Sequence, residues 1–277
     1  MRLFGRNFSD LNPLFWNIAT RKGILARNIK DFFGKERFAS ERRTETLPAA
    51  VSSYRSALIK TGPGIDPETQ TNKAVNIRLA SEKICGMVIK PGETFSFWRA
   101  VGNVSKKQGY KEGRVIRRGT LVRGTGGGLC NLANTINNLV LRSPLEITEF
   151  HKHSDALACD IGHRVPMANG TSVSFNYVDY RFKNNTGCCV QLLVRCEGGD
   201  LVAELRSEKE FPFSYDISEE GHRFVKEDGR YYRVSKIYKD TKNRATGETV
   251  ERELIWDNRS LVMFDPALIP EEELKER

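Results

Sequence analysis

Three consecutive glycines, Gly126 to Gly128, lead directly into an apolar stretch that begins at Cys130. Glycine costs conformational entropy in any fixed structure, so such a run indicates a backbone with a positive φ or one that passes close to another group. The apolar residues that follow recur at helical spacing: Leu132, Ile136, Leu139 and Val140. The sequence therefore predicts a buried helix headed by Cys130, with a positive φ, or a ligand too close for a Cβ, at Gly127 or Gly128.

The first third of the chain has a helical pattern. Residues 1–45 are basic and helix-like, with interruptions expected at Pro13 and Gly23. Glycine and proline in residues 61–70 predict a loop. We then expect a helix over residues 72–85, with its first residue, an asparagine, as the N-cap.

Strand patterns dominate the second half. Residues 171–182 alternate between apolar and polar side chains, and residues 188–196 and 201–205 follow after short turns. These three segments predict a meander of three strands. Further turn signals separate the strands expected between Phe211 and Met263.

Helices that precede strands, with one buried helix between them, indicate an α+β fold. The central helix headed by Gly-Gly-Gly-Leu-Cys is expected to pack on an antiparallel sheet. We divide the chain into a basic, helical N-terminal arm (1–45), a core domain (46–210) and a β-rich C-terminal extension (211–277).

The formal net charge of +9 is concentrated near the N-terminus. Residues 1–45 hold ten Lys and Arg against five Asp and Glu. This arm either lies on an anionic membrane surface or docks on its own domain as an amphipathic helix. Nucleic acid is not an expected partner, because no nucleic-acid-binding motif accompanies the charge.

The sequence contains no apolar run of the roughly 18–20 residues that a membrane span needs. Its N-terminus has no secretory signal pattern. We therefore expect a cytoplasmic protein, with a peripheral position on the membrane as the alternative. Its six cysteines show no paired CxxC spacing, and we expect reduced thiols and no cofactor.

Cys130 and two histidines suggest thiol chemistry. A cysteine at a helix N-terminus is stabilised as thiolate by free amides and the helix dipole. His151 and His153 follow on a strand-like segment, so either is a candidate base. Amides of the glycine run would then stabilise an oxyanion. The carboxylates considered for orienting the imidazole are Asp155, Asp160 and Asp179.

Other readings of the same residues stay open. His151 and His153 are two residues apart and would share one strand face as metal ligands, with Cys130, Asp155 or Cys159 as companions. The glycine run and helix N-terminus would also hold an anionic group without any thiol chemistry. A purely structural role for these residues is the third possibility.

Three segments resemble the signature segments of the VanW family: KPGETFSFWRAVG, GTGGGLCNLANTINNLVLRSPLEITEFHKHS and NYVDYRFKNNT. With RVSKIYKD and LVMFDP, the resemblance extends over about residues 72–266. It implies an accessory protein of glycopeptide resistance of the vancomycin B type, one that acts on or senses cell-wall precursors or peptide-like small molecules. For an enzyme of this layout, amide hydrolysis or acyl transfer is the expected reaction.

Several residues of this chain fall on the family's recurring positions: Gly126, Gly127, Gly128, Cys130, His151 and His153. Two positions depart from the family pattern. Asn131 stands where the family usually has glutamine, and Gly170 stands where many members carry aspartate. Asn131 still offers a side-chain amide to a ligand, with a reach that is shorter by one methylene.

Overall fold

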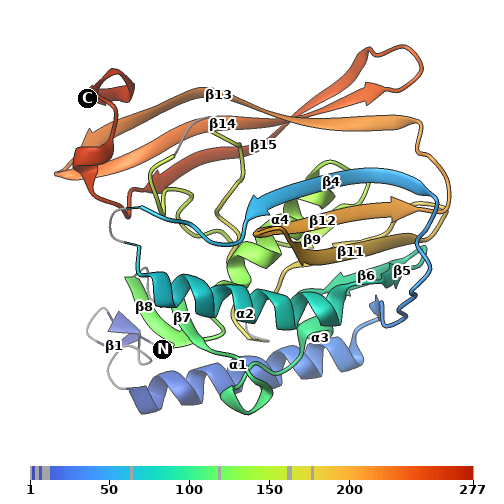
Figure 1. Cartoon of the computed structure of the whole chain (residues 1–277), viewed down its shortest axis with the longest axis horizontal. Coiled ribbons are helices and arrows are strands. Elements are labelled where there is room, and N and C mark those ends of the chain that lie inside the picture. The colour runs from blue at the N-terminus through green and yellow to red at the C-terminus, as the bar shows by residue number, and fades with distance from the viewer. Residues whose placement is uncertain are drawn as a thin grey trace.

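The computed structural model (Figure 1) describes residues 2–3, 6–7, 13–62, 65–117, 120–160, 164–175 and 178–276. Its α-helices are α1 (Pro13–Phe33), α2 (Pro67–Ile84), α3 (Phe97–Val101) and α4 (Leu129–Leu141). Short 3-10 turns lie at Lys106–Gln108, Pro266–Leu268 and Glu271–Glu273. The strands between and after these helices confirm the α+β class.

The strands of the described residues form three four-stranded sheets and two ribbons. The core sheet has the order β4 (Ala49–Ala57), β12 (Asp200–Ser207), β11 (Val190–Glu197) and β5 (Met87–Ile89). A second sheet has the order β3 (Arg37–Phe38), β6 (Glu93–Ser96), β10 (Arg181–Lys183) and β9 (Glu146–Glu149). The C-terminal sheet has the order β15 (Thr249–Leu261), β14 (Arg230–Asn243), β13 (Phe213–Glu227) and β16 (Leu274–Glu276). The ribbons are β1 (Arg2–Leu3) with β2 (Arg6–Asn7), and β7 (Glu112–Arg117) with β8 (Thr120–Thr125).

Helix α4 packs on the core sheet, which is antiparallel throughout, as the sequence predicts. Every residue of α4 from Leu132 to Leu141 is buried. The hydroxyl of Ser52 on β4 donates to the carbonyl oxygen of Leu139 at 3.0 Å. The apolar side chains of α4 belong to the hydrophobic core, and their burial against the sheet stabilises this part of the fold. The helix also buries polar side chains, of which Asn134 and Asn138 donate to the carbonyl oxygen of Met167.

The C-terminal sheet lies on the opposite side of the molecule from α1 (Figure 1). Ile237 and Trp256 from this sheet share a small buried cluster with Leu141 at the end of α4. The predicted strands between Phe211 and Met263 are confirmed as β13, β14 and β15.

The two long helices of the first third of the chain differ from the prediction, one in where it begins and one in lacking a break. Helix α2 begins at Pro67 rather than at Asn72, because Asp66 caps it by accepting a hydrogen bond from the amide of Glu68. Helix α1 runs through Gly23 without a break. Gly23 is half-buried, and a glycine inside a helix is tolerated where tertiary packing supports the backbone.

The predicted strand over residues 171–182 and the meander that it begins are wrong. A turn closed by Ser174 and Val178, which exchange backbone hydrogen bonds, interrupts that segment. Residues 176–177 lie outside the described part of the chain. Alternation is a local pattern that an irregular segment also satisfies, so only the hairpin β11–β12 of the meander forms.

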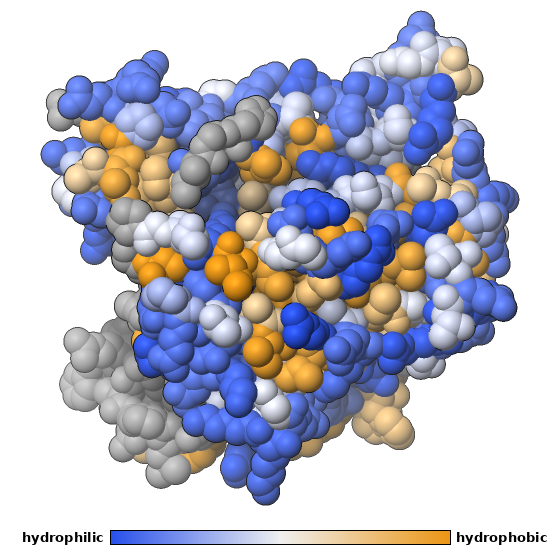
Figure 2. Space-filling view, in the orientation of Figure 1, coloured by the Kyte–Doolittle hydropathy of each residue, from blue (hydrophilic) through white to orange (hydrophobic). Residues whose placement is uncertain are grey.

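On the face shown in Figure 2, apolar side chains gather in a band over α2 and the core sheet, and the rim is hydrophilic. Across the described residues, no helix combines the length and the apolar character needed to cross a membrane.

Candidate functional site

A cavity of about 580 Å³ opens at the N-terminal end of α4, bounded by α1, α2, β7 and the segments that follow β9. Five of the residues proposed from the sequence line it: Gly126, Gly128, Cys130, Asn131 and His153. Three of them lie outside its lining: Gly127, His151 and Asp155. The cavity therefore joins the candidate thiol to one of the two candidate histidines.

The glycine run forms the turn between β8 and α4. Gly128 has a φ of 100°, which confirms the positive φ predicted for Gly127 or Gly128. Gly126, for which no positive φ is predicted, also has one, of 82°. Gly128 is the N-cap of α4, and its carbonyl oxygen accepts from the amide of Asn131 at 2.9 Å. The buried Asn76 of α2 donates to the carbonyl oxygen of Gly127 at 2.9 Å. The turn is thus fixed to α2 as well as to α4.

Packing within the chain itself explains why the turn has no side chains. A Cβ on Gly127 would lie 2.4 Å from the carbonyl carbon of Gly113 and 2.7 Å from the amide nitrogen of Arg114. A Cβ on Gly128 would lie 2.4 Å from Cγ of Lys73. Strand β7 and a lysine of α2 therefore leave no room for a Cβ at Gly127 and Gly128, without any ligand at these two positions.

Cys130 lies half-buried in the first turn of α4. Its Sγ donates to the carbonyl oxygen of Val173 at 3.6 Å. Burial raises the pKa of the Cys130 thiol, against the effect of the helix N-terminus. Among the described residues, no hydrogen bond joins this sulfur to a histidine. The group that the cavity presents at neutral pH is a thiol rather than a thiolate.

We expect Cys130 to react slowly with iodoacetamide at pH 7.5, since only the thiolate attacks. In the native protein, its rate should be at least about tenfold below that of the same thiol in the urea-unfolded chain. Peptide mapping by mass spectrometry resolves Cys130 from the other free cysteines. Modification of native Cys130 faster than of the unfolded chain would show an activated thiolate.

His153 lines the cavity from the segment after β9. Its backbone amide donates to the carbonyl oxygen of Gly170 at 2.9 Å, and its Nδ1 donates to the carbonyl oxygen of Ser154 at 2.8 Å. Burial lowers the pKa of the ring below its usual value. His153 is therefore a neutral imidazole held in place by backbone carbonyls.

His151 belongs to a different set of contacts. Its Nε2 lies 2.8 Å from Oε1 of Glu149. Each of the two carboxylate oxygens of Glu149 also accepts a hydrogen bond from Arg27 of α1. Burial alone would raise the pKa of Glu149, but the hydrogen bonds from Arg27 and His151 hold it at about 2. This network joins α1 to β9 and does not reach the cavity.

The three candidate carboxylates bind arginines or backbone rather than an imidazole. Asp155 accepts from Arg164 at 2.6 Å, and Asp160 lies 2.8 Å from the buried Arg233 of β14. Asp179 is fully buried, and its carboxylate accepts hydrogen bonds from four residues, none of them a histidine: Ser96, Trp98, Tyr180 and Arg181. The described residues therefore contain no carboxylate–imidazole pair at His153.

Three cations at the cavity are absent from the sequence prediction. Lys60, Lys73 and Arg114 line it, and no described Asp or Glu lines it or pairs with them. Burial, together with the nearby charges of Lys60 and Arg114, lowers the pKa of Lys73 to about 8. Local sequence gives no signal for Lys73, because it resembles any polar position of an amphipathic helix.

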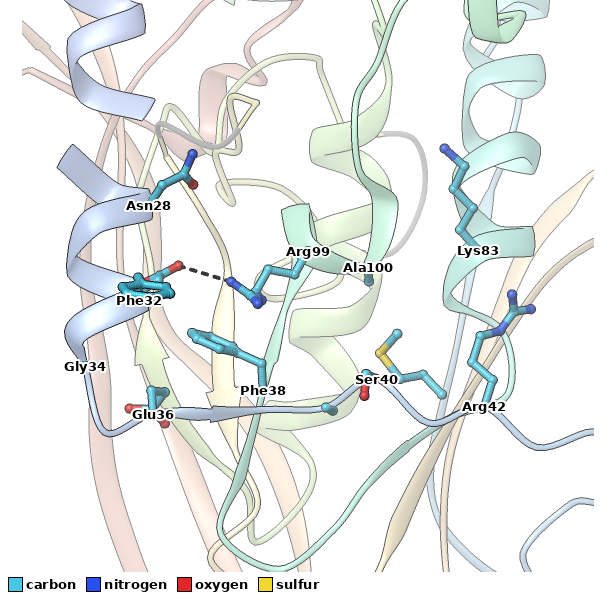
Figure 3. Close-up of a pocket in the computed structure, with 13 residues that line it drawn as sticks. Asn28, Phe32, Gly34, Glu36, Phe38, Ser40, Arg42, Lys83, Arg99 and Ala100 are labelled. Atoms are coloured by element: carbon cyan, nitrogen blue, oxygen red, sulfur yellow. Dashed lines mark ion pairs between the residues drawn. The ribbon is translucent and has the colours of Figure 1, made fainter. Parts of the chain in front are cut away.

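A second cavity of about 870 Å³ lies between α1, the segment around β3 and α2 (Figure 3). Its cations are already engaged by the protein. Lys83 donates to the carbonyl oxygen of Val101 at 2.8 Å, and Arg42 donates to that of Glu82 at 2.6 Å. Arg99 stacks on Phe38 and faces Asp31 at 3.9 Å. The cavity beside α4 is therefore the stronger candidate for ligand binding.

The interpretation of His151 and His153 as metal ligands has little geometric support. Within the described ranges, no group of three or more His, Cys, Asp and Glu side chains is arranged to hold a metal ion. His151 and His153 do not converge, since the first bonds Glu149 and the second lines the cavity.

Comparison with known proteins agrees with the signature segments. The family model described as VanW like protein matches residues 72–206. The chain is 28% identical to the vancomycin B-type resistance protein VanW of Enterococcus faecalis over 227 residues, which are 79% of this chain and 80% of that protein. Residues 72–206 of the chain are therefore VanW-like. The chain is also 32% identical to the uncharacterized protein YoaR of Bacillus subtilis over 136 residues, 49% of this chain and 43% of that protein. No solved structure matches the chain.

The residues that line the cavity include positions inside and outside the VanW match. Lys73, Arg114, Cys130 and His153 lie inside the matched range, whereas the residues of α1 precede it. The departure at Gly170 has a structural reason in this chain. Gly170 has a φ of 106°, and a Cβ there would lie 2.6 Å from the indole of Trp256.

Proposed function

We propose that the chain is an accessory protein of glycopeptide resistance that binds an anionic group of a cell-wall precursor in the cavity beside α4. The match of residues 72–206 to the VanW family model and the similarity to a relative named as a vancomycin B-type resistance protein support this class. A terminal carboxylate or a phosphate is the group that the lining chemistry favours. The observation that carries the proposal is the set of Lys60, Lys73 and Arg114 around the N-terminus of α4.

Lys73 is costly to the fold without an anionic ligand. Its ammonium is partly buried beside two other cations, and no described carboxylate neutralises it. An unpaired charge in such a place destabilises the folded state, so its presence favours a functional role. The positive end of the α4 helix dipole adds further attraction for an anion.

A thiol-dependent amide hydrolase or acyltransferase is the second candidate, because Cys130 and His153 line one cavity. The chemistry of these two groups supports it less well. The Cys130 pKa is raised, its sulfur bonds a backbone carbonyl oxygen, and no carboxylate orients His153. Binding of an anion needs neither a thiolate nor a base.

Lys73→Met should weaken binding of nucleotide-linked muramyl pentapeptide, which carries a pyrophosphate and a terminal carboxylate, by at least about tenfold. Isothermal titration calorimetry measures this effect. In the parent protein, affinity should fall as pH rises through about 8, because the Lys73 ammonium then loses its proton. A bound anion raises that pKa, so the fall in affinity begins near pH 8 and ends at the higher pKa of the complex. The variant should lack this fall.

Folding stability provides an independent readout. Lys73 has a folded pKa of about 8 against an ordinary value of 10.5, so its charge destabilises the fold below about pH 8, and this cost declines toward pH 10.5. Lys73→Met should therefore be at least as stable as the parent at pH 7. Lys209→Met, which removes an exposed lysine elsewhere, is the matched control. Equal affinity of all three proteins for the precursor would overturn the proposal.

A further inference from the structure

The outward face of α1 carries a continuous apolar stripe. Its exposed apolar residues are Ile18, Leu25, Ile29, Phe32 and Phe33. Phe32 is 82% exposed and Leu25 is 61% exposed. Spacings of seven, four and three residues place the first four on one side of an α-helix. Figure 2 shows apolar atoms projecting at the lower edge of the molecule, where the C-terminal half of α1 lies in Figure 1.

Ion pairs on the inward face fix the rotation of this helix. Arg27 pairs with Glu149 at 2.6 Å, and Asp31 pairs with Arg181 at 2.7 Å. These pairs are partly or largely buried, and Arg27 and Asp31 lie one helical turn apart. Most of the apolar stripe is therefore held outward, whereas Phe32 near its end also lines the second cavity (Figure 3).

Charge distinguishes the partners that this face would accept. Helix α1 contains four Lys and Arg residues and one acidic residue, and that acidic residue, Asp31, is turned inward. Arg21, Lys22 and Lys30 are exposed on or beside the stripe. A second copy of the chain packed face to face would oppose these cations to one another. An anionic lipid surface instead accepts apolar side chains at the acyl boundary and cations at the headgroups.

We propose that the outward face of α1 binds an anionic membrane surface. The proposal goes beyond the ligand site and does not depend on it. The inward face of the same helix contributes Thr20 and Ile24 to the cavity beside α4. Attachment through α1 would therefore hold that cavity beside the lipid headgroups.

Co-sedimentation of the full chain with vesicles tests the proposal. Binding to vesicles of phosphatidylglycerol and phosphatidylcholine should exceed binding to phosphatidylcholine alone by at least about tenfold. Raising salt from about 0.1 M to about 1 M shortens the Debye length from about 10 Å to about 3 Å and should release most of the protein. The double variant Leu25→Gln and Phe32→Gln should lower the partition coefficient at least about tenfold.

Matched variants on another face separate a specific surface from general stickiness. Val250→Gln with Leu254→Gln removes two exposed apolar side chains of β15 and should leave vesicle binding unchanged. Lys22→Gln with Lys30→Gln should weaken binding, whereas Lys226→Gln with Lys236→Gln should not. Circular dichroism confirms that each variant is folded. Equal partition of the α1 and β15 variants, or loss of a dimer in light scattering on changing α1, would overturn the proposal.

Discussion

Gly127→Ala is expected to lower the free energy of unfolding by about 3 kcal/mol, because the added Cβ would overlap backbone atoms. It would lie 2.4 Å from the carbonyl carbon and 2.5 Å from the Cα of Gly113, both on β7. These atoms belong to a strand paired with β8 and cannot rotate away as a side chain can. Urea unfolding followed by circular dichroism measures the loss.

Gly187→Ala provides the control for this substitution. Gly187 has no atom within 4 Å of its Cβ position and does not have a positive φ. Its replacement should be neutral or slightly stabilising, since alanine reduces the entropy of the unfolded chain. If Gly127→Ala is as stable as Gly187→Ala, strand β7 can move away from the turn at no cost.

The sequence predicted the glycine turn but not its neighbour. A positive φ, the buried helix α4, the hairpin β11–β12 and the C-terminal strands all follow from patterns within a few residues. The contact between Gly127 and Gly113 joins two segments across a hairpin, and no periodicity encodes it. The same limit applies to residues 171–182, where alternation suggested a strand and the chain instead turns at Ser174.

The candidate site, like the fold, follows from the sequence only in part. The residue types and their order predict Cys130 and His153 as site residues, and the fold does bring them to one cavity. Their electrostatic state depends on burial, which the sequence could not supply. Lys73 is one of 44 Lys and Arg residues, and only its position against Gly128, in a cavity shared with Lys60 and Arg114, distinguishes it.

Asp179 was one of three candidates for orienting a histidine, and its contacts describe a structural carboxylate. Its Oδ2 accepts from the hydroxyl of Ser96 at 2.6 Å and from Nε of Arg181 at 2.8 Å. Its Oδ1 accepts from the amides of Trp98 at 3.1 Å and Tyr180 at 2.9 Å. One fully buried side chain therefore joins β10 to the start of α3, whose Trp98 forms part of the cavity wall.

Asp179→Ala should consequently cost about 3–5 kcal/mol of unfolding free energy, because it leaves several buried donors without an acceptor. Asp179→Asn, which keeps the shape and one acceptor oxygen, should fall between this variant and the parent. Asp200→Ala is the control, since its carboxylate pairs with the exposed Arg55 at 2.8 Å and should contribute about 0.5 kcal/mol or less. Thermal and urea unfolding of the four proteins measure the order. A loss for Asp179→Ala no larger than that for Asp200→Ala would show that β10 and α3 hold their positions without this carboxylate.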